Sequence, residues 1–182
     1  MTWRSVAVYW LLGVALAGVV YTEWSARNPV DVEIERPASP VVVADSPIDG
    51  VVARHGEMVL EIRKEDDRWR LRRPSGVRLP SDLVDALVDT LITLPPVEIV
   101  EEVDTRADEF GLAPPMFSIQ LQTGQRTLAT VDLGKRNPTR TAVYARVQGT
   151  ERIYLLGLNA RYYAELIYEE IDKQLESGRP GL

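Results

Sequence analysis

Apolar and polar positions divide the chain into an unbroken apolar run, a short polar connector and a longer region of alternating and helical periodicity. Residues 5–22 carry no charge, and Trp3 and Trp24 flank this run. At about 1.5 Å per residue, a helix between the two tryptophans spans about 30 Å, the thickness of the hydrocarbon layer of a bilayer. The pattern predicts one transmembrane helix within residues 1–24, in contact with the lipid through residues 5–22.

Charged and small residues around this run suggest its orientation and leave an alternative open. Arg4 precedes the run and Glu23 follows it, so we expect the N-terminus in the cytoplasm. The segment 15–17, Ala-Leu-Ala, has the form of a signal-peptidase site, and a cleaved signal peptide is therefore the alternative to an anchor. Both interpretations export the rest of the chain. Gly13 and Ala17 are candidates for contact with another transmembrane helix, the alternative being that they face lipid.

A connector separates this run from the first strand of a regular domain. Residues 25–40 read SARNPVDVEIERPASP and contain three prolines and several charges, which favours an extended linker. Val32 and Ile34 alternate with acidic residues, so an edge strand is the alternative for this stretch. We expect one domain over residues 41–176, followed by a tail at 177–182.

Alternation of apolar and polar residues predicts three strands and a helix in the first half of the domain. The expected strands cover residues 48–53, 58–64 and 68–72. In the third, Trp69 and Leu71 alternate with three arginines, which places Trp69 in the core and the arginines on the opposite face. Leucines four residues apart then indicate an amphipathic helix that begins near Ser81 as N-cap and ends before residue 95.

The second half predicts four more strands and a second helix. Alternation covers residues 117–122, 128–133, 143–147 and 153–156, with a loop at 134–139, and an apolar stripe follows in a helix that begins near Asn159. Tyr144 and Tyr154 are expected to point away from the side of the sheet that carries Val143 and Ala145. The order of strands, helix, strands, helix with short connections predicts an α+β fold: antiparallel sheets with a helix on a face of each, preceded by the transmembrane helix.

Composition restricts the chemistry that this domain can perform. The chain has no cysteine and one histidine, His55, which excludes disulfides, thiolate nucleophiles and multi-histidine metal sites. A net charge of −6 gives no reason to expect nucleic-acid binding. No hydrolase, phosphate-loop, dinucleotide or zinc-protease motif is present in the sequence. We therefore expect no catalytic, cofactor or metal residues, and interpret His55 as a surface loop residue.

Two charged clusters and two tyrosines are the candidate contact residues. The acidic residues between 98 and 109 lack the spacing of a calcium loop, so we interpret them as a solvated edge. The candidate contacts with a partner are Arg68, Arg70, Arg72, Tyr144 and Tyr154. For the arginines, the alternative is a solvated sheet face on which they pair with acids of neighbouring strands.

Three stretches resemble a known family. RWRLRRPSGVRLPSDLVDALVDTLITL, EFGLAPP with FSIQLQTGQRTLATVDLGK, and TAVYARVQGTERIYLLG are similar to the domain-of-unknown-function family 4340, over roughly residues 50–173. The resemblance implies an exported, membrane-tethered protein with an accessory role in the cell envelope, since some members are encoded with ABC transporters of the gliding-motility type. It implies no catalytic residue.

Two functions of different classes follow from these observations. The first is a non-enzymatic, single-pass accessory or scaffold subunit in the inner membrane. Its domain would lie in the periplasm or outside and contact a membrane-embedded protein complex. The alternative is an exported module that binds a small ligand, lipid or glycan, through the sheet face or the loop around Asn137.

Overall fold

The computed structural model describes residue 3, residues 39–41, 43 and 46–100, and residues 107–177. The predicted transmembrane helix, with Gly13 and Ala17, and residues 25–38 of the predicted linker lie outside this set. In the described part of the chain, no helix is long and apolar enough to cross a membrane. Residues 1–36 and 37–182 form separate units, and the fold described below is that of the second unit.

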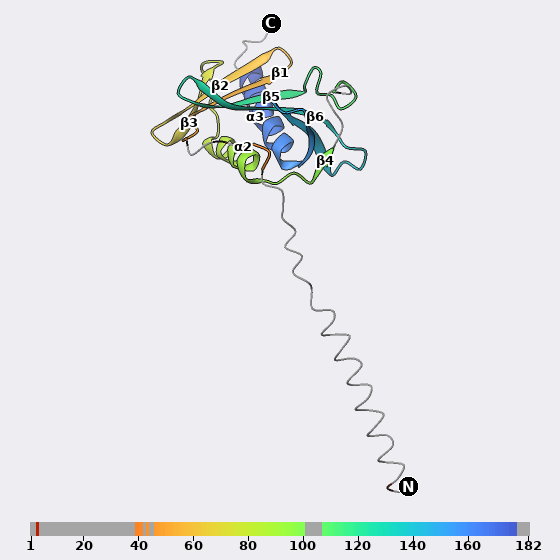
Figure 1. Ribbon diagram of the computed structural model, residues 1–182. Helices are drawn as coiled ribbons and strands as arrows, with labels where there is room; N and C mark the ends of the chain where they lie inside the picture. Colours follow the sequence, from red (N-terminus) through yellow and green to blue (C-terminus); the bar gives the residue numbers. More distant parts are fainter. Residues whose placement is uncertain (1–2, 4–38, 42, 44–45, 101–106, 178–182) are drawn as a thin grey trace. The chain divides into compact units, whose positions relative to one another are not determined.

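The second unit has an α+β fold, as the sequence predicts (Figure 1). Its elements follow the expected order of strands, helix, strands and helix. They are β1 (Gly50–His55), β2 (Met58–Glu65), β3 (Arg68–Arg73), α2 (Ser81–Thr93), β4 (Glu98–Val100), β5 (Phe117–Thr123), β6 (Arg126–Arg136), β7 (Ala142–Val147), β8 (Ile153–Gly157) and α3 (Asn159–Ser177).

The strands form one antiparallel sheet, whereas the sequence predicts a separate sheet for each half. The order of the strands is β3-β2-β1-β5-β6-β7-β8-β4. Pairing of β1 with β5, in which Val51 lies opposite Leu121, joins the two halves. Because the halves share one sheet, α2 and α3 pack against each other and on the same face of it, instead of on two sheets (Figure 1).

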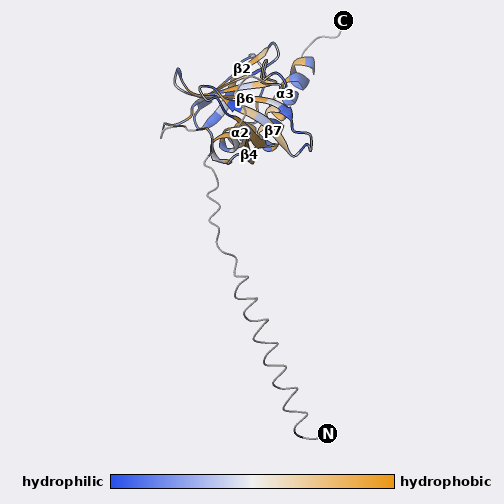
Figure 2. Cartoon of the chain, turned by 45° about the vertical axis from the view of Figure 1, so that its right-hand side comes forward, coloured by the Kyte–Doolittle hydropathy of each residue, from blue (hydrophilic) through white to orange (hydrophobic). Residues whose placement is uncertain are grey.

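Alternating positions on the strands and the apolar stripes of the helices build the main core. Hydrophobic and hydrophilic residues alternate along the strands (Figure 2). Apolar positions of β1, β2, β5, β6 and β7 meet both helices in a single cluster. In α2, Leu87 and Leu91 of the predicted stripe are buried and Leu83 is partly buried, and in α3 Ile167 and Ile171 are buried. We call the side of the sheet that carries these helices the inner face.

A second, smaller cluster lies on the outer face. Leu112 and Ile153 are fully buried there, and the ring of Phe110 lies 4.5 Å from that of Tyr144. The segment at residues 107–116 therefore covers this part of the outer face. Gly134 of β6 permits the close approach, because a Cβ atom at this position would lie 2.2 Å from the backbone oxygen of Phe110.

Ser81 joins a strand to a helix instead of capping the helix. The N-cap residue of α2 is Pro80, and the Oγ of Ser81 accepts a hydrogen bond of 2.9 Å from the backbone N–H of Trp69. The indole Nε1–H of Trp69 donates to Asp85 of α2 over 2.7 Å. Trp69 is 3% exposed, which confirms its predicted place between the sheet and this helix.

The end of β6 and the end of the linker differ from the boundaries that the sequence predicts. The strand β6 continues to Arg136, so the loop after it begins at Asn137, whose Oδ1 accepts the backbone N–H groups of Thr141 and Ala142 over 2.9 and 3.1 Å. At the other end of the domain, the Oγ of Ser39 donates to the backbone oxygen of Leu91 over 3.0 Å. Ser39 therefore already contacts α2, although the predicted linker extends to residue 40.

Candidate functional site

The first candidate site is the arginine edge, which we define as Arg68, Arg70 and Arg72 of β3. All three side chains are exposed on the outer face, and Trp69 between them is buried on the inner face, as the alternation predicts. Glu65 of β2 lies 3.7 Å from the Nε of Arg70 and also pairs with Arg72. Such exposed pairs contribute about 0–1 kcal/mol each, so the arginines can exchange Glu65 for a partner's carboxylate at little cost.

A groove runs along the free side of this edge strand. Its volume is about 670 Å³, and residues 68–71, 77–79 and 81 line it. Arg78 adds a third guanidinium to those of Arg68 and Arg70. Because β3 ends the sheet, an extended segment of another protein can approach its outer side, where the backbone N–H of Trp69 is already bonded to Ser81. The groove thus places positive charge along the edge strand of the sheet.

The second candidate site is a row of polar residues across the outer face. Arg54 of β1 lies opposite Ser118 of β5, Ser118 lies opposite Asp132 of β6, and Asp132 lies opposite Arg146 of β7. Residues that are directly opposite each other on adjacent strands share a face of the sheet. Four strands thus bring these side chains together, and we call them the polar row.

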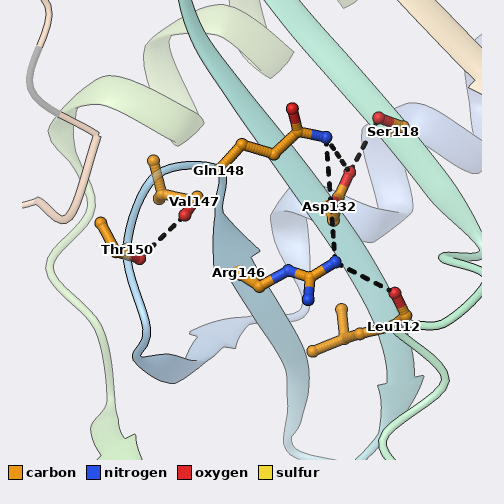
Figure 3. A network of polar contacts seen from close by, with 7 residues as sticks. All are labelled: Leu112, Ser118, Asp132, Arg146, Val147, Gln148 and Thr150. Carbon is orange, nitrogen blue, oxygen red and sulfur yellow. Dashed lines mark hydrogen bonds and ion pairs between the residues drawn. The ribbon is translucent and has the colours of Figure 1, made fainter. Parts of the chain in front are cut away.

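Asp132 is the centre of the polar row (Figure 3). The residue is 1% exposed, and a buried carboxylate is costly unless it is paired and hydrogen-bonded. Ser118 donates to its Oδ1 over 2.8 Å, and Arg146 donates to its Oδ2 over 3.3 Å. The amide of Gln148 lies 3.4 Å from the same Oδ2. Arg146 also donates to the backbone oxygen of Leu112 over 3.3 Å, which fastens the covering segment to the sheet.

A pocket of about 410 Å³ opens beside this network. Its lining comes from the β1–β2 turn, from the proline-containing part of the covering segment, from the polar row and from the turn after β7. The residues are Arg54, Gly56, Pro114, Pro115, Ser118, Asp132, Arg146 and Gln148. This pocket is not predicted from the sequence. The signal available was a polar residue at an outer position of each strand, but only the pairing of the strands places these residues side by side.

The two candidate tyrosines lie on opposite faces of the sheet. Tyr144 is on the outer face, as expected, half-buried against Phe110. The predicted orientation of Tyr154 is wrong: it lies opposite Ala145, on the inner face, and is 8% exposed. A side chain packed in this way offers little surface to a partner, so of the two tyrosines Tyr144 is the one that remains a contact candidate.

His55 is exposed and ends β1, rather than lying in the loop that follows. Its ring stacks on Phe117 with 4.3 Å between centroids and lies 5.3 Å from Tyr168. The Nδ1 atom is 2.7 Å from the backbone oxygen of Met116, and this nitrogen therefore carries a proton, because a carbonyl oxygen only accepts. These contacts describe a ring held by aromatic packing at the end of a strand.

The hydroxyl group of Tyr168 is a buried polar group that no hydrogen bond in the described part of the chain compensates, and we predict the effect of removing it. Its hydroxyl is buried without a hydrogen-bond partner among the described residues, and burial raises the pKa of the phenol above its usual value. We expect Tyr168→Phe to raise the free energy of unfolding by about 1 kcal/mol, since it removes an unsatisfied group. Urea denaturation measures the change, with Tyr163→Phe on the same helix as control. A clear loss of stability would show that the hydroxyl has a partner.

The acidic run is only partly described. Glu98 and Glu109 are exposed, whereas Glu101, Glu102 and Asp104 lie outside the described residues. Within the part of the chain that the structure places, no three acidic or histidine side chains form a group that could hold a metal ion.

Comparison with known proteins places most of the second unit in a family. The family model DUF4340, a domain of unknown function, matches residues 69–177. The match begins at Trp69 and ends with α3, so it includes Asp132 and Arg146, whereas Arg54 and Arg68 precede it. No curated protein and no solved structure matches the chain.

Proposed function

We propose that this chain, which belongs to the DUF4340 family of domains of unknown function, is a non-enzymatic, single-pass accessory or scaffold subunit of a membrane complex in the cell envelope. Its domain would lie on the periplasmic or outer side of the inner membrane. The resemblance described above makes an ABC transporter the class of complex that we favour. The subunit would act through protein–protein contacts.

The groove at the arginine edge is the observation that carries this proposal. Arg68, Arg70 and Arg78 place three positive charges around the free side of β3, in a protein whose net charge is −6. An extended acidic segment of a partner would lie in this groove and pair with the guanidinium groups through its side chains. The preferred partner is therefore an acidic, extended segment of a membrane-embedded protein.

The uncharged run at residues 5–22 explains how a weak contact would be sufficient. A domain tethered by a short linker meets a partner in the same membrane at an effective concentration of about 1 mM. A contact with a dissociation constant below this value would be mostly occupied. In the proposed role, the anchor raises the effective concentration of the domain, and the groove supplies the contact with the partner.

The alternative function, an exported module for a small ligand, lipid or glycan, is favoured by a different observation. The pocket beside the polar row has a volume of about 410 Å³ and convergent polar groups, which are the usual properties of a ligand site. The two functions use different residues and are compatible in one domain.

Reversal of two charges at the groove tests the accessory role. In the full-length protein in its native membrane, we expect Arg68→Glu with Arg70→Glu to reduce the recovery of cross-linked partner at least about tenfold, because two attractions become repulsions. Arg126→Glu is the matched control, since Arg126 is exposed at the start of β6 and does not line this groove. Equal recovery from the control and the double variant would contradict the proposed surface.

A second arm of the experiment tests the anchor. Residues 1–24 are replaced by a cleavable signal, and the exported domain is compared with the full chain at the same low concentration. We expect the freed domain to fold and to lose the partner on dilution. If it retained full partner binding and activity, the anchor would serve for localisation alone, and the proposed joint action would be wrong.

A further inference from the structure

We propose that the pocket beside the polar row binds a small organic oxyanion, such as a carboxylate with an apolar body. The residue that would pair with the oxyanion is Arg54, with Pro114 and Pro115 as the apolar wall. This site lies on a different set of strands from the groove at the arginine edge. The proposal stands independently of the accessory role.

The charges around the pocket favour an anion. Two arginines and one aspartate line it, so the lining carries a net positive charge. The carboxylate of Asp132 already accepts from Ser118, Arg146 and Gln148. Arg54 has no hydrogen bond or ion pair through its side chain with any residue of the described ranges. The guanidinium of Arg54 is thus the group in this pocket that a ligand's oxygen atoms can still pair with.

The register of the sheet sets the distance over which a ligand would extend. Arg54 lies opposite Ser118, one strand away, and Asp132 and Arg146 follow on the next two strands. Neighbouring strands are separated by about 4.8 Å, so Arg54 stands about 10 Å from Asp132 across the sheet. A ligand with its oxyanion at Arg54 would therefore extend its body over Ser118 toward Gln148.

Asp132 holds two lining residues of the pocket, Arg146 and Gln148, in place and does not need to touch the ligand. It fixes Arg146 through a contact of 3.3 Å and Gln148 through one of 3.4 Å. Arg146 in turn holds the backbone of Leu112, in the same segment as Pro114 and Pro115. The side chains of Arg146 and Gln148 and the apolar wall are therefore positioned before any ligand arrives, which lowers the entropy lost on binding. Asp132 is a positioning residue in this proposal.

Size and surface chemistry point to a compact ligand. The volume of about 410 Å³ falls in the lower part of the range for small-molecule sites, about 300–1,000 Å³. The rings of Pro114 and Pro115 provide apolar surface, which favours a carboxylate that carries an aliphatic or aromatic group over a bare ion. A phosphate monoester shares the oxyanion chemistry and is separated from a carboxylate by experiment.

A titration with three probes tests this site. The full chain in non-ionic detergent is titrated with benzoate, acetate and inorganic phosphate at constant ionic strength, and binding is followed by ligand-observed NMR. We expect benzoate to saturate with a dissociation constant of about 1 mM, a value consistent with the free energy available to so few atoms. Acetate should bind more weakly than benzoate, because it cannot cover the prolines. Saturation by phosphate with higher affinity than benzoate would assign the oxyanion to a phosphate.

Variants at Arg54 decide whether the binding belongs to this pocket. We expect Arg54→Gln to raise the dissociation constant about tenfold, since one charge-assisted pair is lost. Arg54→Lys, which keeps the charge and loses the planar fork, should give an intermediate value. Arg126→Gln is the matched control, an exposed arginine that does not line the pocket, and should change the constant less than about twofold. The proposal is overturned if no probe saturates at concentrations about tenfold higher than expected, or if the Arg54 and Arg126 variants behave alike.

Discussion

Truncation of Trp69 to alanine is expected to lower the free energy of unfolding by about 3–5 kcal/mol. The side chain is 3% exposed and lies between the sheet and α2. The substitution would leave a cavity beneath the helix and take away the indole N–H that binds Asp85 over 2.7 Å. The ammonium of Lys64, 5.6 Å from the centre of the ring, would also lose its aromatic contact.

Chemical denaturation of the full chain, followed by the signal of the folded domain, measures this loss. Tyr162→Ala is the matched control, because Tyr162 is a large aromatic residue with 54% exposure, and its loss should be well below 1 kcal/mol. Trp69→Phe keeps a ring in the core and should fall between the two. A change of only a few tenths for Trp69→Ala would show that the indole is accessible to a partner.

Replacement of Asp132 by alanine is expected to cost about 3 kcal/mol. Removing one member of a buried ion pair typically costs 3–5 kcal/mol, because the other charge stays buried without compensation. We place Asp132 at the low end, since the side chain of Arg146 keeps 20% of its exposure and water can partly solvate it. Ser118 and Gln148 would lose their acceptor as well.

A double-mutant cycle separates the ion pair from the rest of this cost. Asp132→Leu, Arg146→Met and their combination are compared by denaturation. We expect the combination to be more stable than Asp132→Leu alone, because it removes both charges of the pair together. Strictly additive losses would show that Asp132 and Arg146 are not energetically coupled.

Local periodicity predicts the elements of this domain well, because each strand and helix has a distinct polar side. The strand with Trp69 between two arginines is an example: its buried and exposed positions agree with the pattern. The strand β8 is the opposite case. Residues 153–156 are all buried, so no polar residue marks its outer face, and the orientation of Tyr154 depends on its pairing with β7. The alternation of residues along one strand does not predict how that strand pairs with its neighbour.

The polar row shows the same limit for the candidate site. Its four residues come from four strands, and the contact between β1 and β5 joins parts of the chain that are far apart in sequence. In the sequence, Asp132 is one acid among many, and the unusual property, its burial, depends on its position between β5 and β7 in the sheet. The basic character of β3 is visible in the sequence because its arginines are neighbours on one strand.

The position of β1 in the sheet has a mechanical consequence for a domain that is held from its N-terminal side. Tension along the chain would reach the fold at Ser39, which is bonded to Leu91, and at Val41, which is 3% exposed. The first strand after them is β1, which is flanked by β2 on one side and β5 on the other. Pulling it out requires two ladders to break together, whereas an edge strand can be unzipped from a single neighbour one hydrogen bond at a time. The first strand on the side that a membrane anchor would pull is therefore one that two neighbouring strands hold.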